Sequence, residues 1–440
     1  MIANHPKNGG NCLKPIFDIT KLYKQKENTL EHAKLLSLKI FLPNLFITMN
    51  VLFWVSLLVI VYTYIGYPLL LFSLVTIKKK ISPQPPRYFE NNELPEITLI
   101  VACYNEGDIL KKKIENTLQL DYPLNKLTLY YVTDGSTDNS CDIILQYPEI
   151  KLFHENERKG KNAAVNRVMD SVKTPITIFC DANTFLNPQA LRLITRHYKN
   201  DKVGAVAGEK RVFQSKEENA AGSGEGAYWK YESKLKIWDS ELNTVVGAAG
   251  ELFSIRTSLY EKVPSGVLIE DFRLSMNIAQ KGYRVIYEPE AYAMETSSLS
   301  MEEENKRKIR ISAGGLIEVW HFLGLLNIFK YRLLSFQYVS HRMMRWTLAP
   351  LGLLLLLIST ISLSIKGHQF YILMLVGQLF FYAAATIGYS LRNRKLKSGL
   401  VFVPYYFVFM NLSVYQGLLM LIRKKQSAIW EKAKRSSLEN

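Results

Sequence analysis

The sequence of 440 residues has few cysteines and lacks the common glycine-rich nucleotide motifs. Its four cysteines form no CxxC pair, so neither a disulfide framework nor a zinc site is indicated. No GxGxxG follows the first apolar strand pattern, which disfavours a dinucleotide-binding Rossmann domain, and no Walker A loop is present. The chain also has no internal repeat and no low-complexity tract. A bound nucleotide would therefore be held by carboxylates on its base and ribose and by cations on its phosphates.

Long apolar runs are present and gather at two places. Residues 51–77 carry no charge and exceed the roughly 20 residues that a bilayer crossing needs. Three more runs follow at 346–365, 370–391 and 400–422. We therefore predict a transmembrane helix at 49–77 and two to three transmembrane segments at 346–422.

The net charge of +16 would suit nucleic acid, but the basic residues cluster beside the apolar runs. The clusters are 78–80, 392–397 and 423–425. Such placement is typical of juxtamembrane anchoring to anionic lipid on the cytoplasmic side. We expect membrane lipids as partners and no nucleic acid. We also expect a multi-pass protein of the inner or plasma membrane with its soluble part in the cytoplasm.

Two basic stretches conflict with this orientation. Residues 1–48 carry many lysines that would have to cross the membrane. This segment is therefore either an extension of doubtful structure or precedes a true start at Met49. The basic tail at 423–440 stays in the cytoplasm only if 400–422, interrupted by Pro404, does not fully cross. We predict a cytoplasmic C-terminus and leave the number of spans open.

Between residues 83 and 301, short apolar runs alternate with helical stretches, which is typical of an α/β domain with a mostly parallel sheet. Strands are expected at 97–102, 127–132, 150–153, 176–179 and 203–207. We place this domain at 95–300, after a proline-containing linker at 78–94 and before membrane-proximal helices at 301–345.

Polar clusters follow the predicted strands one after another. They are Tyr104-Asn105-Glu106, Asp134-Gly135-Ser136, His154-Glu155-Asn156 and Asp181-Ala182-Asn183. Ligands of parallel sheets lie at the carboxyl ends of the strands. A single polar strand end is ordinary loop chemistry, but four in order indicate a binding site.

The residue types at these positions suit a nucleotide diphosphate. Glu106 and Asp134 can accept hydrogen bonds from a uracil or ribose, and Lys161 follows a glycine at a helix start that suits a phosphate. Asp181 and Asn183 offer oxygen ligands two positions apart, which fits Mg²⁺ or Mn²⁺ better than zinc. For Asp134 and Lys161, a structural turn and a solvated charge run are the competing interpretations.

Further charged residues follow the predicted sheet. Glu270 and Asp271 precede an amphipathic stretch, where the helix dipole should keep Asp271 ionised; a plain helix cap is the alternative. Arg307 and Arg310 are three apart, so they share a helical face and can neutralise a departing diphosphate.

These motifs occur in a recognisable order. The segments are 101–106, 134–138, 159–166, 181–183, 247–256 and 270–271. Together with the flanking spans they resemble the membrane-bound branch of glycosyltransferase family 2, which includes hyaluronan, poly-N-acetylglucosamine and cellulose synthases. The resemblance implies a GT-A fold, a nucleotide-sugar donor that is a UDP-sugar, and a divalent cation.

The resemblance also implies roles for single residues. Asp134 would bind the nucleoside with Tyr104 and Glu106 nearby. Asp181 and Asn183 would match the DxD element. Gly250 and Glu251 would lie on the acceptor side with Glu270, and Asp271 would be the catalytic base of an inverting transfer.

Two positions depart from the family pattern. DxD is DAN here, and the QxxRW motif of the polymer-making members corresponds to 307–311, where Ile311 replaces the tryptophan. Isoleucine has no π-face for stacking on a sugar, so single-sugar transfer to a lipid-linked or glycan acceptor is expected. Residues 316–329 are read either as an interfacial helix that guides this acceptor or as plain packing.

Two other functions stay open. One is a processive polysaccharide synthase of the cell wall or exopolysaccharide type, and the other is a non-catalytic nucleotide-binding subunit of a biosynthetic complex.

Overall fold

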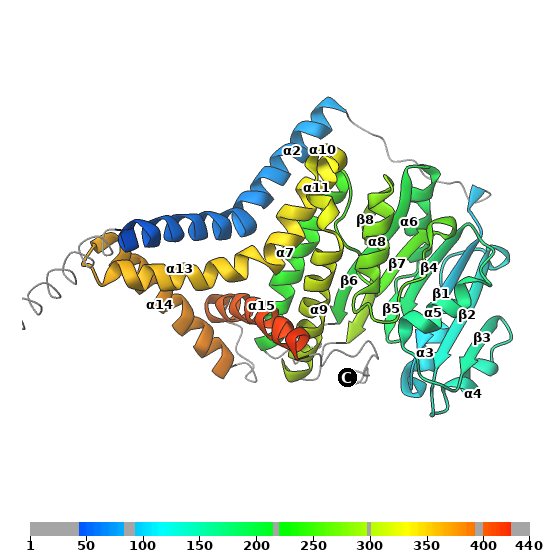
Figure 1. Ribbon diagram of the computed structural model, residues 1–440. Coiled ribbons are helices and arrows are strands. Elements are labelled where there is room, and N and C mark those ends of the chain that lie inside the picture. Colours follow the sequence, from blue (N-terminus) through cyan, green and yellow to red (C-terminus); the bar gives the residue numbers. More distant parts are fainter. Residues whose placement is uncertain (1–43, 83–92, 214–219, 297–300, 392–398, 424–440) are drawn as a thin grey trace, which may run out of the picture.

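The computed structural model describes residues 44–82, 93–213, 220–296, 301–391 and 399–423. Residues 1–43 and 424–440 lie outside this range, and so do the predictions made for the extension and most of the basic tail. A sheet domain occupies one side of the molecule and long helices extend away from it on the other (Figure 1).

The sheet has eight strands in the order β3-β2-β1-β4-β7-β6-β8-β5. Their bounds are β1 (Ile97–Cys103), β2 (Leu127–Asp134), β3 (Ile150–Glu155), β4 (Ile176–Asp181), β5 (Thr184–Leu186), β6 (Val203–Phe213), β7 (Leu252–Arg256) and β8 (Arg284–Thr296). All five expected strands are present. β7 runs antiparallel to both β4 and β6, and β5 antiparallel to β8, so the sheet is mixed although its first four strands are parallel.

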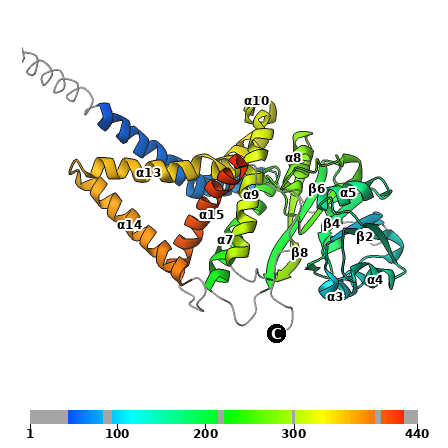
Figure 2. The ribbon, with the colours of Figure 1, turned by 60° about the horizontal axis from the view of Figure 1, so that its bottom comes forward.

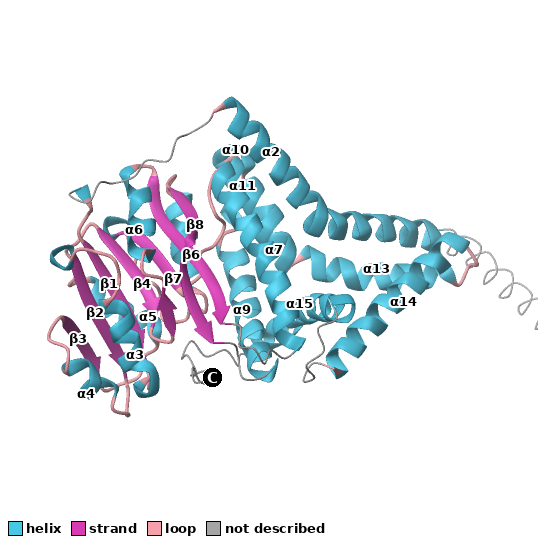
Figure 3. Ribbon diagram, turned by 180° about the vertical axis from the view of Figure 1, so that it is seen from behind, coloured by secondary structure: helices cyan, strands magenta, loops and turns pink. Residues whose placement is uncertain are grey.

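Helices cover both faces of the sheet (Figure 3). They are α3 (Gly107–Leu118), α4 (Ser140–Leu145), α5 (Lys161–Met169), α6 (Ala190–Thr195), α7 (Ala220–Leu242) and α8 (Glu270–Gln280). Every residue of β1 is buried. Because successive side chains of a strand point to opposite faces, Ile100 packs in one core while Leu99 and Val101 pack in the other. These two cores hold the carboxyl ends of the strands in fixed positions.

The first membrane candidate is a helix of 38 residues, Asn44–Ile81, longer than the predicted 49–77. It contains a short π-helical segment at Tyr62–Gly66 and continues as α2 (Tyr67–Ile81). In α2, Tyr67, Leu71 and Val75 pack against α7. The second half of this helix is therefore part of the sheet domain's own packing.

The other membrane candidates are α13 (Leu348–Ser364), α14 (Gln369–Ser390) and α15 (Gly399–Ile422), close to the three predicted runs. In the described parts of the chain, three helices are long and apolar enough to cross a membrane, or four if the bent pair that ends in α13 counts as one span. α13 and α14 form a hairpin that points away from the sheet, whereas α15 lies beside α9 and α7 (Figure 2).

The membrane-proximal region consists of one long helix followed by several short ones, in agreement with the predicted helices at 301–345. It comprises α9 (Met301–His321), a 3-10 turn Leu323–Leu326, α10 (Ile328–Tyr331), α11 (Leu333–Gln337), a π-turn Tyr338–Met343 and α12 (Met344–Trp346). A continuous interfacial helix at 316–329 is thus wrong, because α9 ends inside this segment. Leu325 is fully buried in the core of the sheet domain, so this part of the segment is packing.

Candidate active site

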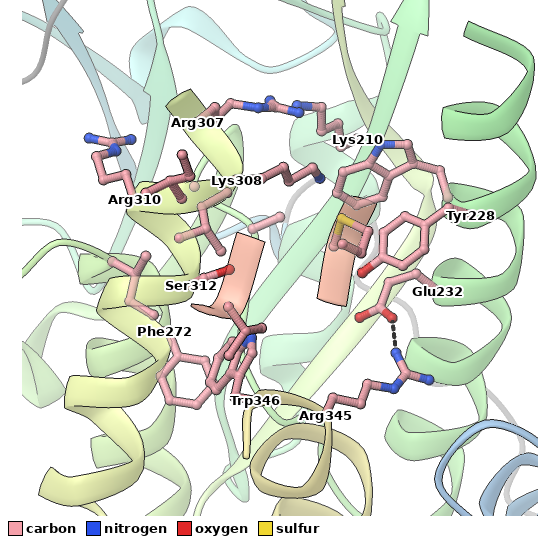
Figure 4. Close-up of a pocket in the computed structure, with 18 of the residues that line it drawn as sticks. Lys210, Tyr228, Glu232, Phe272, Arg307, Lys308, Arg310, Ser312, Arg345 and Trp346 are labelled. Carbon is pink, nitrogen blue, oxygen red and sulfur yellow. Dashed lines mark hydrogen bonds and ion pairs between the residues drawn. The ribbon is translucent and has the colours of Figure 1, made fainter. Parts of the chain in front are cut away.

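A cavity of about 880 Å³ lies where the sheet domain meets the helices of the membrane side. It is lined by residues from β4, β6, α7, α8, α9, α12 and α15, among others (Figure 4). The predicted site residues that line it are Lys161, Asp181, Gly250, Glu251, Glu270, Asp271, Arg307 and Arg310. Residues as far apart in the sequence as Lys161 and Arg310 thus line the same cavity.

A second, smaller pocket adjoins this cavity and shares Lys161 with it. Tyr104 and Asp134 line this pocket, and the guanidinium carbon of Arg158 lies 3.6 Å from the centroid of the Tyr104 ring. Glu106 and Asn183 are buried, at 2% and 8% exposure, but line neither pocket. The structure therefore brings Tyr104, Asp134 and Lys161 together in one pocket. Glu106 and Asn183 are buried outside both pockets.

Asp134 is positioned by the loop that precedes α5. Its Oδ2 accepts hydrogen bonds from the backbone N–H of Lys159 at 3.1 Å and of Gly160 at 2.6 Å. Its buried Oδ1 accepts no hydrogen bond within the described chain, and the nearest cation is Arg167 Nη1 at 4.0 Å. This oxygen is an acceptor that a nucleoside N–H or O–H could satisfy.

Lys161 joins two carboxylates in the wall of the main cavity. Its Nζ lies 2.7 Å from Asp181 Oδ1 and 3.0 Å from Glu270 Oε1. Burial alone would raise the pKa of Glu270, but the Lys161 ammonium outweighs burial and the pKa lies below its ordinary value. Glu270 is therefore ionised at neutral pH.

Asp271 is adjacent to Glu270 but has the opposite shift. Burial, reinforced by the charge of Glu270, raises the pKa of Asp271 to about 7. The N–H of Phe272 donates to Asp271 Oδ1 at 2.8 Å and opposes this shift without cancelling it. The expectation that the helix dipole keeps Asp271 fully ionised is wrong, because desolvation is the larger effect. A carboxyl group with a pKa near the working pH is well suited to general base catalysis.

Gly250 lies directly against Asp271. A Cβ built on Gly250 would lie 3.5 Å from Asp271 Oδ2. The next residue, Glu251, accepts a hydrogen bond at 2.8 Å from the buried Lys210, which also pairs with Glu295. The predicted acceptor-side residues thus flank the candidate base.

Arg307 and Arg310 share a face of α9 as predicted, but their surroundings differ. Arg307 pairs with Glu295 at 3.3 Å and with Glu304 at 3.1 Å. Arg310 lines the cavity and forms no ion pair with any described residue. Arg310 is therefore the better placed of the two to meet a phosphate.

Arg345 and Trp346 also line the cavity and were missed from the sequence. The Trp346 ring lies 5.2 Å from that of Phe272, and a Cβ on Gly315 would approach it to 2.6 Å (Figure 4). Arg345 Nη1 is 2.8 Å from Glu232. An arginine–tryptophan pair with the spacing of the QxxRW motif is thus present at 345–346, with Arg342 at the position of the glutamine. Because Trp346 lies in the cavity wall, 342–346 is a second candidate for this motif beside the predicted 307–311.

The carboxylates of the cavity bear on the predicted metal site. Within the described chain, no group of three or more His, Cys, Asp or Glu residues is arranged to hold a metal ion. Mg²⁺ is commonly bound through one or two carboxylates plus substrate phosphates and water, which Asp181 fits. Asn183 does not line the cavity, so its predicted role as a ligand has no support in this geometry.

Comparison with solved structures defines the class of domain. The chain matches a mannosyltransferase from Pyrobaculum calidifontis, solved with GDP-mannose and Mn²⁺, with a TM-score of 0.62 and 19% sequence identity. The match covers 85% of this chain and 100% of the other. At this identity the match establishes the fold alone: the domain is a GT-A domain, as the sequence resemblance implied.

Sequence comparison matches the sheet domain to a family. Residues 98–263, less than half of this chain, match the model described as glycosyl transferase family 2. Poly-beta-1,6-N-acetyl-D-glucosamine synthase of Staphylococcus aureus (strain MSSA476) is 27% identical over 236 residues, which cover 51% of this chain and 55% of the synthase. A probable glycosyltransferase of Bacillus subtilis, YdaM, is 26% identical over 255 residues, or 54% of this chain and 60% of YdaM. The chain thus matches little more than half the length of these relatives.

Proposed function

We propose that this chain is an inverting glycosyltransferase that moves a sugar from a UDP-sugar to a hydroxyl of a glycan or lipid acceptor at the membrane. The observation that carries the proposal is the half-buried Asp271, with its pKa raised to about 7, in a cavity that is also lined by the nucleotide-side residues Lys161 and Asp181. The family 2 domain and the polysaccharide synthase among its relatives favour a role in envelope or exopolysaccharide synthesis.

The donor would lie across the two pockets. Asp134 Oδ1 accepts a hydrogen bond from the nucleoside beside Tyr104, and Lys161 and Arg310 face the diphosphate. When bound through Asp181, Mg²⁺ or Mn²⁺ would supply further neutralisation of the diphosphate charge. The Mn²⁺ in the structurally similar mannosyltransferase supports this cofactor.

The transfer itself requires one proton acceptor. Asp271 takes the proton of the acceptor hydroxyl, whose oxygen bonds to C1 of the donor sugar from the side opposite the diphosphate. The bond from C1 to the phosphate oxygen breaks, and its electron pair leaves with the nucleotide diphosphate beside the cations of the wall. The configuration at C1 is inverted because one displacement occurs.

Processive polymer synthesis is the second candidate, and Trp346 favours it. The absence of a tryptophan at 311 was the main argument for transfer of a single sugar. With Trp346 in the cavity wall, an aromatic face is available to a sugar on the acceptor side. Product length on a sizing gel separates the two: a ladder of polymers supports the synthase, and a single product supports one-step transfer.

We infer a cytoplasmic catalytic domain and a cytoplasmic C-terminus. Lys78, Lys79 and Lys80 lie in the last turn of α2, on the domain side of the first membrane candidate. At the opposite end of that helix, Phe46 lies 5.3 Å from His368, which precedes α14. The hairpin of α13 and α14 would then cross and return, while α15 stays beside α9 on the domain side.

The decisive experiment is a hydrolysis screen of the purified full chain against nucleotide sugars, with Mg²⁺ or Mn²⁺. Release of UDP from one UDP-sugar is expected and would identify the donor. A chain that binds nucleotide but releases none from any donor, with or without added acceptors, would instead be the non-catalytic subunit of a biosynthetic complex.

A further inference from the structure

The main cavity extends well beyond Asp271, between α7 and α15. On the α15 side its wall is mostly apolar and aromatic. These residues are Val403, Tyr406, Phe407, Met410 and Val414. They recur at spacings of three and four, so they form one face of a helix that is itself a membrane candidate. This face can accommodate a hydrocarbon chain.

The opposite wall carries three lysines around the Trp229 ring, together with Glu232 and Glu251. The ammonium groups of Lys210, Lys236 and Lys308 lie 5.4, 5.7 and 5.3 Å from the centroid of the Trp229 ring. They come from β6, α7 and α9, which are distant in the sequence. Figure 4 shows Lys210 and Lys308 directed to the same side of the cavity.

Lys236 differs from the other two lysines in its partners. Lys210 pairs with Glu251 at 2.8 Å and Lys308 with Glu304 at 3.3 Å. Lys236 lines the cavity at 5% exposure and has neither a hydrogen bond nor an ion pair with any residue that the structure describes. Among the described residues, its ammonium group faces the rings of Trp229 and Tyr287, at 5.7 and 5.3 Å from their centroids.

A buried ammonium without an anion is costly, and an incoming anion would remove this cost. Burial lowers the pKa of Lys236, as expected for a cation removed from water. Three carboxylates favour its charge, those of Glu232, Glu251 and Glu209, but each has other partners. Glu232 is shared by Arg342 and Arg345 at 2.8 Å each, Glu251 pairs with Lys210, and Glu209 accepts hydrogen bonds from Ser233 and Tyr287. The N–H donors of the Lys236 ammonium are therefore available to an anionic ligand.

We propose that the space between α7 and α15 binds a phosphate-bearing amphiphile, with its anionic head at Lys236 beside Trp229 and its hydrocarbon chain along α15. Resting on the proposed function, this assigns the acceptor to the class of lipids with a phosphate head, which carry the reacting hydroxyl to Asp271. The phosphate serves for binding and is not the nucleophile, because an anionic nucleophile would need no base. The nucleophile is the hydroxyl that Asp271 deprotonates.

The test uses the full-length protein in a non-ionic detergent and three soluble probes measured by titration calorimetry. These are octyl phosphate, inorganic phosphate and octyl glucoside. We expect octyl phosphate to bind about tenfold or more tightly than either of the others, because it alone uses both walls. Equal binding of inorganic phosphate would assign the site to a free anion, and equal binding of octyl glucoside would assign it to neutral amphiphiles; either result overturns the proposal.

Variants locate the head group. Lys236→Gln should weaken octyl phosphate binding about tenfold, while Lys236→Arg should retain it. Lys234→Gln is the matched control, since Lys234 lies on the exposed face of the same helix and should bind as the wild type does. Undiminished binding by a folded Lys236→Gln protein refutes the assignment, and the wild-type comparison of probes stands even if this variant does not fold. Nucleotide release by the wild type is scored separately, so failure of the transferase proposal is distinguishable from failure of this one.

Discussion

Glu270 and Asp271 are neighbouring carboxyl groups whose environments give them different protonation at neutral pH. The Lys161 ammonium contacts Glu270 at 3.0 Å and keeps it ionised, whereas Asp271 lies half-buried beside that negative charge. Two adjacent carboxyl groups with separated pKa values are a common basis for dividing catalytic roles. Here Asp271, whose pKa is about 7, is the carboxyl group that lies against Gly250, a residue predicted for the acceptor side.

Replacing the base should separate chemistry from binding. We expect Asp271→Asn to reduce the transfer rate by about 10²- to 10⁴-fold while leaving the nucleotide dissociation constant within a few-fold of wild type. Transfer is followed by labelled sugar incorporation and nucleotide binding by calorimetry. Turnover at the wild-type rate in this variant would eliminate Asp271 as the base.

The pH dependence follows from the same carboxyl group. Because the pKa of Asp271 is raised to about 7, the active, deprotonated form is lost as the pH falls through 7. The transfer rate at saturating donor should therefore rise between pH 6 and 8 and level off above. A rate that is flat from pH 5 to 8 would mean that the base has an ordinary carboxyl pKa.

Trp346 can be tested against a tryptophan that lies outside the cavity. We expect Trp346→Ala to raise the acceptor KM about tenfold and to shorten any polymeric product, because the aromatic face and its contact with Phe272 are lost. Trp320→Ala is the control, since Trp320 is 78% exposed on α9. Equal acceptor kinetics in both variants would contradict a role for Trp346 in acceptor binding.

At the scale of elements, most of the strands that could be predicted have nearly unbroken apolar runs, β3 with Lys151 being the exception. β1, β2 and β4 are buried almost throughout, so their sequences carry a strong signal. β8 contains Glu288, whose buried carboxylate is matched by Arg196 at 2.5 Å and His197 at 2.7 Å. Such a strand is stabilised by partners about 90 residues away in the sequence, so no local sequence pattern predicts it.

The residues that line the candidate site were predictable to a similar extent. Strand-end residues such as Asp134 and Asp181 were found because they follow clear strands. Arg345 and Trp346 were missed because they adjoin an apolar run, and only the packing of Trp346 on Gly315 and Phe272 assigns them to the cavity.

The contact of α15 with α9 depends on close backbone approach at Gly417. A Cβ at this position would meet the backbone nitrogen of Ala313 at 2.8 Å and the carbonyl oxygen of Ile309 at 3.1 Å. We expect Gly417→Ala to destabilise the protein by about 1–3 kcal/mol, seen as a lower thermal unfolding midpoint in detergent. Gly377→Ala on α14 is the control, because nothing lies within 4 Å of its Cβ and alanine favours a helix by up to about 1 kcal/mol. Equal midpoints would show that α15 can move away from α9 at no cost.

At the scale of the whole molecule, the cavity links three layers. Its walls run from the end of β4, through α8 and α9, to the apolar face of α15. Donor and acceptor would thus approach from different phases, the donor from water and the acceptor from the membrane. In the proposed orientation, the sheet domain and the hairpin tip of α13 and α14 lie on opposite sides of the bilayer.

Cysteine labelling in cells tests that orientation. With Cys12 and Cys141 replaced by alanine, Lys366→Cys at the hairpin tip should react with a membrane-impermeant maleimide in intact cells. Lys173→Cys in the sheet domain and Arg423→Cys after α15 should react only after permeabilisation, because the clusters of positive charge favour the cytoplasm. Labelling of Arg423→Cys in intact cells would mean that α15 crosses the membrane and that the C-terminus is outside.

The packing of α2 on α7 also decides how this protein can be prepared for study. Lys78 donates to the carbonyl oxygens of Glu241 at 2.9 Å and Leu242 at 2.7 Å, and the Tyr67 hydroxyl donates to the buried Asp239. A shortened chain beginning at residue 95 would lack α2. The apolar and charged side chains of α7 that α2 covers would then be exposed to water. Soluble expression of the sheet domain alone should therefore yield aggregates. Detergent or nanodisc samples that keep the helix from Asn44 onward are the form in which crystals, inhibitors and antibodies should be sought.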